Sequence, residues 1–226
     1  MLSSHIASQI YKNFGFDPTP GQKTVVERLS RFIAEAPTDR TFILNGYAGT
    51  GKTTLVAALV RTLEEMGVPA VLLAPTGRAA KVMSRYAGRK AYTIHKKIYR
   101  QKTLASAESH FSLDYNKQKN AVFIVDEASM LSNYSPDGSL FGSGQLLDDL
   151  VTYVRRGAGC RLILVGDTAQ LPPVGLEHSP ALDMHFQSKK DRIFGAGISF
   201  FMLRRDIFAT PSPAAVIKAM EQGRSP

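Results

Sequence analysis

The sequence predicts a doubly wound α/β fold, in which helices cover both faces of a parallel β-sheet. Four short apolar runs, residues 41–45, 70–74, 121–125 and 161–165, have the length and the β-branched content of buried strands. A stretch with helical periodicity lies between the first two runs, and we expect helices on both faces of the sheet, as in folds built from βαβ units. A polar, glycine-containing or acidic segment follows each run. Because ligands of open α/β sheets bind at the carboxyl ends of the strands, we expect these segments to form one site.

The first run leads into a glycine-rich loop, residues 46–54, which reads Gly-Tyr-Ala-Gly-Thr-Gly-Lys-Thr-Thr. This loop matches the Walker A pattern G-x-x-x-x-G-K-[ST]. Its glycines allow backbone N–H groups to point at phosphates, while Lys52 can place a charge on the β- and γ-phosphates. The Thr53 hydroxyl can ligate magnesium. The alternative is a glycine-rich turn without a ligand.

A helix is expected directly after the loop, since apolar residues repeat at helical spacing through Glu65. The bound phosphates would then also meet a helix N-terminus. The residues of the loop predicted to bind nucleotide are Gly46, Ala48, Gly49, Thr50, Gly51, Lys52, Thr53 and Thr54.

The run 121–125 places an acidic pair, Asp126 and Glu127, at the end of a strand. Adjacent residues of a strand point in different directions, so the two acids can have different roles. We expect Asp126 to contact the magnesium ion and Glu127 to orient and deprotonate the attacking water. The alternative is an ordinary pair of surface acids.

The run 161–165 is followed by Gly166-Asp167 and then by Gln170. An amide side chain can bond both to a phosphate oxygen and to water, so Gln170 suits a sensor of the γ-phosphate. Pro172 and Pro173 stiffen the segment that follows. In the alternative interpretation, Asp167 and Gln170 only cap a turn.

Together these three motifs resemble motifs I, II and III of superfamily 1 DNA helicases of the RecD/Dda/Pif type, which are P-loop ATPases of the AAA family. The segment Gly-Asp-x-x-Gln-Leu-Pro-Pro-Val is the most specific of them. The resemblance implies a RecA-like P-loop NTPase domain that uses ATP and Mg²⁺ and moves along single-stranded DNA. Lys52, Glu127 and Gln170 would be its catalytic residues, and Thr53 and Asp126 would hold the metal.

Two further segments match the family pattern. Residues 74–81 look like motif Ia, and Thr93-Ile94-His95 looks like the family segment that follows. The resemblance implies that Thr76, Arg78 and His95 contact DNA, and a hydroxyl and a guanidinium after a strand are suited to gripping phosphates. For Arg78 and Lys81 a solvated helix face is the alternative. For His95 the alternative to DNA contact is a histidine packed against other side chains.

Upstream, residues 18–22 open an amphipathic stretch whose apolar residues are Val25, Val26, Leu29, Phe32 and Ile33. In the family a glutamine at such a helix start reads the adenine edge, and Gln22 matches it. Its amide can equally cap the helix.

The resemblance covers roughly residues 14–183, so we assign residues 1–183 to the motor domain and residues 184–226 to a tail without a recognised domain. A family helicase needs a second motor domain, whose arginines reach the γ-phosphate. We find no such motif here, and we do not assign that role to Arg204 or Arg205. We therefore expect feeble ATPase activity, since an arginine finger contributes on the order of 10³ to 10⁵ in rate.

No strand or helix period is evident in the tail before residues 214–222. We hypothesise that the natural gene is truncated or shifted in frame near residue 183. The alternative is a genuine divergent subdomain.

Composition fits a polyanionic partner, since 28 Lys and Arg face 19 Asp and Glu, although seven basic and three acidic residues lie in the tail. The single cysteine, Cys160, fits a reducing compartment, and no apolar stretch approaches the roughly 20 residues of a membrane span. We expect a cytoplasmic protein with no membrane contact. We interpret residues 102–119 as an exposed connection and residues 132–144 as a surface loop, with a mobile element near DNA as the alternative for the second segment.

The prediction from sequence is thus the first motor domain of a DNA helicase, incomplete in this chain and dependent on a second motor domain. One alternative is an inactive helicase remnant that binds nucleotide or DNA without turnover. Another is a P-loop ATPase that acts on a different partner.

Overall fold

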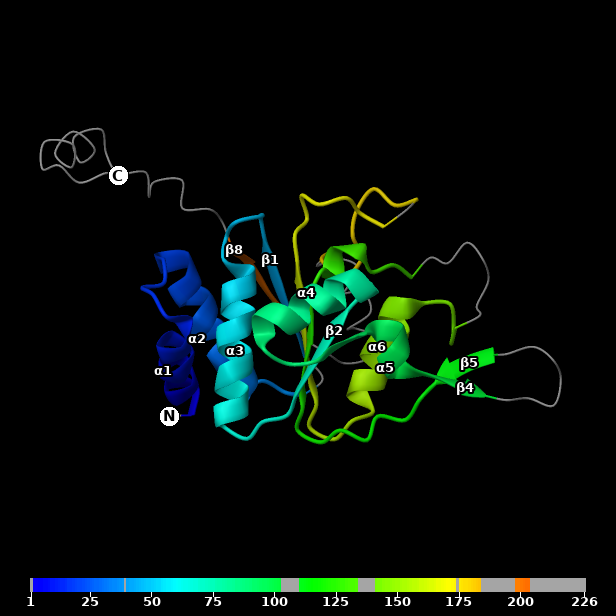
Figure 1. Cartoon of the computed structure of the whole chain (residues 1–226), viewed down its shortest axis with the longest axis horizontal. Coiled ribbons are helices and arrows are strands. Elements are labelled where there is room, and N and C mark those ends of the chain that lie inside the picture. The colour runs from blue at the N-terminus through cyan, green and yellow to red at the C-terminus, as the bar shows by residue number, and fades with distance from the viewer. Residues whose placement is uncertain are drawn as a thin grey trace, which may run out of the picture.

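A computed structural model of the chain describes residues 2–38, 40–102, 110–133, 141–173, 175–183 and 198–203. Its main element is a parallel sheet of six strands in the order β3-β2-β6-β7-β1-β8 (Figure 1). The strands are β1 (Thr41–Gly46), β2 (Ala70–Ala74), β3 (Ala91–Thr93), β6 (Val122–Val125), β7 (Arg161–Gly166) and β8 (Ile198–Leu203). All four predicted strands are present, and the predicted doubly wound α/β fold is confirmed.

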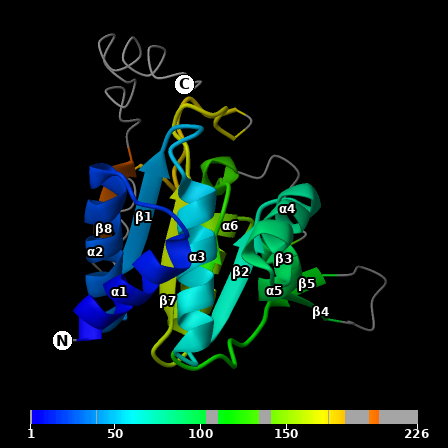
Figure 2. The same ribbon diagram turned by 60° about the vertical axis from the view of Figure 1, so that its left-hand side comes forward.

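Helices lie on both faces of the sheet, because alternate residues of its strands point to opposite sides. Phe42 and Leu44 belong to one buried cluster, whereas Ile43 belongs to the other. The first cluster holds α1 (Leu2–Phe14), α2 (Pro20–Glu35), α3 (Lys52–Glu65) and α4 (Gly77–Ala87). The second holds α5 (Ile94–Ile98), η1 (Ala128–Met130) and α6 (Leu146–Arg155). Figure 2 shows α3 in front of the strands and α6 behind them.

Two helices form where their sequences predict them. The five apolar residues expected on one face of α2 are all buried, and α3 ends at Glu65 as its periodicity predicts. Helix α1 was not predicted, although Ile6, Ile10 and Phe14 follow the i, i+4 spacing of a helix and are buried. None of the helices in the described ranges combines the length and apolar character that a membrane span requires.

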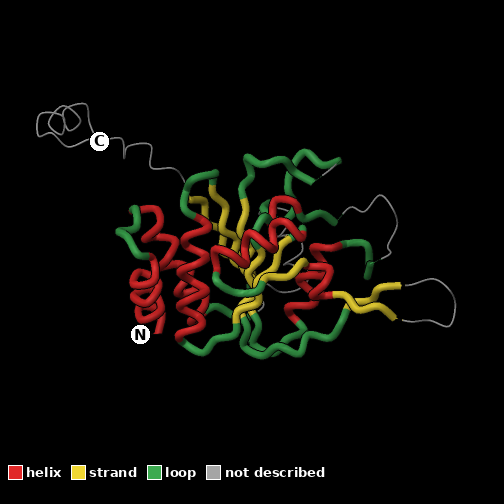
Figure 3. The backbone as a smooth tube through the Cα atoms, viewed as in Figure 1, coloured by secondary structure: helices red, strands yellow, loops and turns green. Residues whose placement is uncertain are grey.

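One expectation about a connection is wrong in part. Within residues 102–119, β5 (His110–Leu113) pairs antiparallel with β4 (Tyr99–Lys102), and Asn116 is buried. This hairpin is visible at one end of the molecule in Figure 3. Residues 103–109 and 134–140 lie outside the described residues, so the expectations of an exposed connection and a surface loop are not tested there.

The tail contains a strand where the sequence indicated none. Residues 198–203 form β8, which pairs in parallel with β1, and Leu203 lies opposite Gly46. The expectation of no regular structure before residue 214 is therefore wrong for this segment. Residues 198–203 contain five apolar residues and one serine without a clear period, and their pairing with a strand 157 residues earlier depends on the whole sheet. The domain boundary at residue 183 and the frameshift hypothesis stay predictions, because most of residues 184–226 lie outside the described residues.

Candidate active site

The three predicted motifs meet at one edge of the sheet because their strands are neighbours. Strands β6, β7 and β1 are adjacent and parallel, so their carboxyl ends lie side by side. These ends carry the acidic pair, the Asp167 segment and the glycine-rich loop. Neighbouring strands are about 4.8 Å apart, which brings side chains from three distant segments within reach of each other. The order of the strands thus brings the three motifs together into one site, as predicted.

The glycine-rich loop has the backbone that its sequence demands. Gly49 and Gly51 have φ values of 77° and 87°, a region that favours glycine. A Cβ atom at Gly51 would lie 2.5 Å from Gln22 Nε2, so a side chain there would displace the Gln22 amide. The loop is closed by the Thr50 hydroxyl, which donates to the Tyr47 carbonyl at 2.8 Å. Helix α3 begins immediately afterwards at Lys52.

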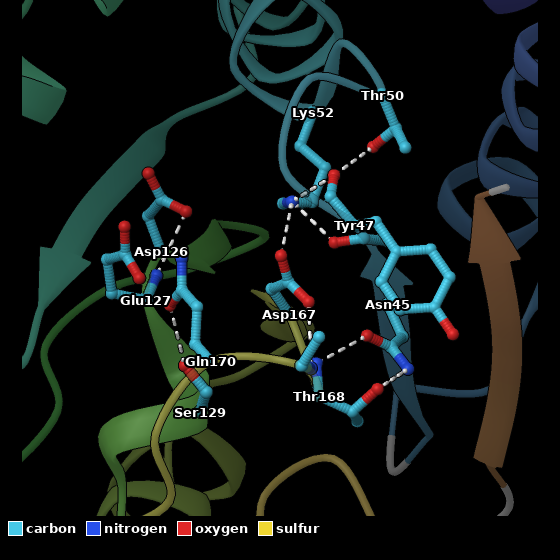
Figure 4. A network of polar contacts seen from close by, with 12 residues as sticks. Asn45, Tyr47, Thr50, Lys52, Asp126, Glu127, Ser129, Asp167, Thr168 and Gln170 are labelled. Carbon is cyan, nitrogen blue, oxygen red and sulfur yellow. Dashed lines mark hydrogen bonds and ion pairs between the residues drawn. The ribbon is translucent and has the colours of Figure 1, made fainter. Parts of the chain in front are cut away.

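Lys52 lies at the centre of the site. Its Nζ donates to the Gly46 and Tyr47 carbonyls at 2.5 and 3.0 Å, and it lies 3.9 Å from Asp167 Oδ2. Figure 4 shows Lys52 and Asp167 facing each other. Burial lowers the pKa of Lys52, and three nearby carboxylates, Asp167 foremost, oppose that effect. The ammonium is therefore held beneath the loop as a preformed positive charge for phosphate.

The acidic pair is held by hydrogen bonds on both of the Asp126 oxygens. The Glu127 amide donates to Oδ1 at 2.9 Å, and the Tyr86 hydroxyl donates to Oδ2 at 2.5 Å. Glu127 itself has a left-handed backbone, with φ of 55°, which is uncommon for a residue with a side chain. Such strained positions cluster at functional sites. This geometry favours the catalytic interpretation of the pair over that of ordinary surface acids.

The environment of Glu127 favours its protonated form. Burial raises the pKa of Glu127, and the neighbouring charge of Asp126 raises it further. Lys52 and a hydrogen bond from Gln170 act in the opposite direction. A carboxyl group with a raised pKa accepts a proton more readily, as a general base requires.

The Asp167 segment shows both the predicted turn and a link to the acidic pair. Asp167 is buried, its Oδ1 accepts from the Ala169 amide at 2.9 Å, and its carbonyl accepts from the Gln170 amide at 3.1 Å. The turn contacts expected from the alternative interpretation are therefore present. The side chain of Gln170 nevertheless bonds outside the turn, because its Oε1 accepts from the Ser129 hydroxyl at 3.3 Å. Gln170 thus lies beside Glu127 (Figure 4), and its role as a γ-phosphate sensor stays a prediction.

Asn45 joins the loop to the Asp167 segment, a contact that sequence reasoning missed. Its amide donates to Thr168 Oγ1 at 3.0 Å and accepts from the Thr168 backbone N–H at 3.1 Å (Figure 4). Asn45 is buried at the end of β1. The available signal was a polar residue at the end of an apolar run, since a buried amide needs partners.

Gln22 adopts the capping role that the sequence left open. Its Oε1 accepts from the Thr19 backbone N–H at 2.9 Å, and Thr19 Oγ1 accepts from the Gln22 amide at 3.3 Å. These two bonds form a capping box at the start of α2. The remaining polar atom, Nε2, donates to the Thr50 carbonyl at 3.1 Å, so Gln22 also supports the glycine-rich loop. Contact with adenine stays a prediction.

The candidate DNA residues lie apart from the nucleotide loop, on α4 and α5. Thr76 and Arg78 are exposed at the start of α4, where Thr76 Oγ1 caps the Ala79 amide at 3.2 Å. His95 is packed as the alternative proposed, with its ring 5.1 Å from Phe141 and 5.7 Å from Tyr99. Burial lowers the pKa of His95, which favours the neutral ring. DNA contact by these residues stays a prediction.

An AAA domain family model matches residues 18–190 of this chain. The chain belongs to the AAA domain family. Within this family, the chain resembles the motor domains of RecD/Dda/Pif-type helicases, as its three motifs predict.

Three curated relatives support this placement. The AAA domain is 32% identical over 160 residues to the ATP-dependent RecD2 DNA helicase of Deinococcus radiodurans, covering 70% of this chain and 19% of that protein. It is 32% identical over 182 residues to the ATP-dependent DNA helicase dda of Enterobacteria phage T4, covering 77% of this chain and 37% of that protein. The Pif1 helicase of Psychrobacter is 29% identical, with 61% of this chain and 20% of that protein covered.

The chain therefore spans less than half the length of these relatives. The crystal structure of Pif1 helicase from Candida albicans matches the fold of this AAA domain with a TM-score of 0.50 at 17% sequence identity. That match covers 93% of this chain and 45% of the other. It supports the RecA-like P-loop NTPase fold.

Proposed function

We propose that this AAA domain binds Mg-ATP and hydrolyses it as the first motor domain of a DNA helicase that moves along single-stranded DNA. The observation that carries the proposal is the arrangement of Lys52, Glu127 and Gln170 at the ends of three adjacent strands. The names of the relatives, which are ATP-dependent DNA helicases, support the same activity. A cytoplasmic location stays a prediction from the single cysteine.

The donor set at this edge of the sheet fits a magnesium ion. Thr53 is exposed at the start of α3, and Asp126 presents a carboxylate fixed by two hydrogen bonds. Both are oxygen donors, which Mg²⁺ prefers, and in nucleotide sites it takes most of its remaining ligands from phosphates and water. When bound, the ion would neutralise charge on the β- and γ-phosphates.

The residues of the chain have distinct roles in the proposed reaction. The loop amides and Lys52 bind the phosphates, and Gln170 orients a water molecule beside the γ-phosphate. Glu127 accepts a proton from that water as its oxygen attacks phosphorus, and the bond to the β-phosphate oxygen breaks, leaving ADP and phosphate. Because no arginine of a second motor domain is identified in this chain, we expect slow turnover by the chain alone.

The experiment that tests the proposal is steady-state ATP hydrolysis by the purified chain with and without single-stranded DNA, alongside nucleotide-binding titrations of the same samples. We expect binding of Mg-ATP with slow, DNA-stimulated hydrolysis. Binding without any turnover would favour the alternative of an inactive helicase remnant. Turnover that DNA does not affect would favour an ATPase with another partner.

The proposed base also predicts the pH dependence of hydrolysis. Since burial raises the pKa of Glu127 above 4.5, its carboxylate becomes protonated at a higher pH than that of an ordinary glutamate. Activity should therefore be full at neutral pH and should fall on acidification with a midpoint above 4.5. A pH–rate profile of single-turnover hydrolysis measures this midpoint. A midpoint at or below the ordinary value would argue against Glu127 as the buried base.

The contacts of Gln22 predict two separable effects of its replacement. Gln22→Ala removes the capping box and the bond to Thr50, so it should lower stability by about 1–2 kcal/mol and also weaken nucleotide binding several-fold. Thr19→Ala removes half of the same cap but leaves the bond to Thr50, and should lower stability alone. Thermal unfolding and titration with a fluorescent ATP analogue measure the two effects. Equal loss of nucleotide affinity in both variants would contradict a role for Gln22 in supporting the loop.

A further inference from the structure

The metal-binding carboxylate of the proposed site is bonded to a helix outside the three motifs. Tyr86 lies in the last turn of α4, and its hydroxyl donates to Asp126 Oδ2 at 2.5 Å. The other oxygen, Oδ1, accepts from the Glu127 backbone N–H at 2.9 Å. Both oxygens are thus fixed, one by the local backbone and one by α4. The direction of the Asp126 carboxylate therefore depends on where α4 sits.

Tyr86 is suited to hold a carboxylate. Its ring packs against the core cluster that α3 and α4 share. A tyrosine hydroxyl carries a proton, so it can donate to the Asp126 carboxylate. A hydrogen bond from a neutral donor to a carboxylate is among the stronger ones in proteins.

Helix α4 is attached to the domain as a unit. Ala80, Met83 and Ala87 on one of its faces are buried. The Ser84 hydroxyl accepts from the Ala91 amide at 2.8 Å, which ties the helix to β3. Close-packed interiors have low compressibility and transmit strain. A displacement at its first turn would then reach Tyr86 in its last turn.

The first turn of α4 carries two of the residues predicted to contact DNA. Thr76 is the N-cap and Arg78 lies in the first turn, and both are exposed. The helix has 11 residues, so its two ends are about 16 Å apart. One short helix thus connects the candidate DNA residues to the candidate magnesium ligand.

We propose that Tyr86 is a positioning residue whose hydroxyl orients Asp126. Through Tyr86, binding of single-stranded DNA at α4 would be coupled to binding of magnesium with ATP. The inference rests on the proposed function. Coupling between two sites is reciprocal, so bound DNA would change the affinity for Mg-ATP by the same factor as Mg-ATP changes the affinity for DNA. The sequence does not reveal this link, because Tyr86 and Asp126 are 40 residues apart.

The test compares the wild-type chain with Tyr86→Phe, which keeps the ring and removes the hydroxyl. A fluorescent ATP analogue is titrated first with EDTA and then at increasing Mg²⁺, with and without an oligothymidylate. We expect Tyr86→Phe to bind the analogue in EDTA as the wild type does. The Mg²⁺ concentration that gives half of the gain in affinity should be about three- to tenfold higher in the variant, which is the effect of one lost hydrogen bond. We also expect the oligonucleotide to shift the Mg²⁺ midpoint of the wild type and not that of the variant.

The matched control is Tyr99→Phe. The Tyr99 hydroxyl donates to Asp149 Oδ2 at 2.7 Å, a bond of the same kind in the other core cluster. Thermal unfolding of both variants shows what each bond contributes to stability. Only Tyr86→Phe should change the Mg²⁺ midpoint.

Three results would overturn the inference. An unchanged midpoint in Tyr86→Phe, or an equal change in Tyr99→Phe, would exclude the positioning role. An oligonucleotide effect that is absent in the wild type, or persists fully in Tyr86→Phe, would exclude the link to DNA. Failure of the proposed function itself is distinguishable, because the wild type would then not bind the analogue, or Lys52→Ala would bind it equally well.

Discussion

Replacing Lys52 by alanine should weaken binding of Mg-ATP by about tenfold to more than a hundredfold and leave no measurable hydrolysis. The Lys52 ammonium lies beneath the loop, bonded to two of its carbonyls and beside Asp167. Hydrogen bonds to charged groups contribute about 1.5–3 kcal/mol each, and Lys52 would make such bonds to two phosphates. Titration with a fluorescent ATP analogue, together with single-turnover hydrolysis of radiolabelled ATP, measures both losses.

The control for Lys52→Ala must separate lost binding from lost folding. Removing Lys52 leaves the buried carboxylate of Asp167 without its cation, which destabilises a fold. A Lys52→Ala/Asp167→Asn double variant removes both charges, so it should recover stability in thermal unfolding without recovering affinity. Lys12→Ala changes an exposed lysine at the end of α1 and should behave as wild type. Wild-type affinity in the folded double variant would contradict the proposed phosphate site.

Replacing Glu127 by glutamine should keep nucleotide binding and lower the rate of hydrolysis by about 10² to 10⁴. Glutamine has nearly the same shape and can still bond to the Gln170 side chain, but it cannot accept a proton from water. General bases contribute factors of this size to enzymatic rates. The measurement is single-turnover hydrolysis at saturating Mg-ATP, with affinity measured on the same samples.

Two variants show whether the loss is specific to the base. Glu35→Gln makes the same chemical change at an exposed position on α2, and should leave the rate unchanged. Asp126→Asn should act differently from Glu127→Gln, because Asp126 is the proposed magnesium ligand and its loss should raise the Mg²⁺ requirement. A Glu127→Gln variant that hydrolyses ATP at the wild-type rate would show that another group activates the water.

Within the site, local sequence was enough to predict the chemical groups and the elements that carry them. The strand before Gly46, the glycines with positive φ and the helix from Lys52 are consequences of residue type and spacing over about 25 residues. The same is true of Asp126 and Glu127 at the end of β6. Such rules are local, because they follow from backbone sterics, hydrogen bonding of the chain to itself and the period of the apolar residues.

The connections between these groups could not be predicted in the same way. The sequence predicted a contact between Gln22 and the nucleotide, but not its bond to Thr50, which joins residues 28 positions apart. Asn45 and Thr168 are 123 positions apart, and Tyr86 and Asp126 are 40 apart. Each pair depends on which strands are neighbours and how a helix is seated on them. A pattern read along one segment does not contain that information.

Residue types and their spacing along the chain were enough to predict the candidate reacting groups, the parallel sheet that presents them and the family to which the chain belongs. The tertiary structure decided the order β3-β2-β6-β7-β1-β8, the inclusion of residues 198–203 in the sheet and the bonds that orient Gln22, Asn45 and Asp126. The reason is physical. Local conformation is set by each residue and its near neighbours, whereas the partner of a buried polar group is set by packing of the whole domain.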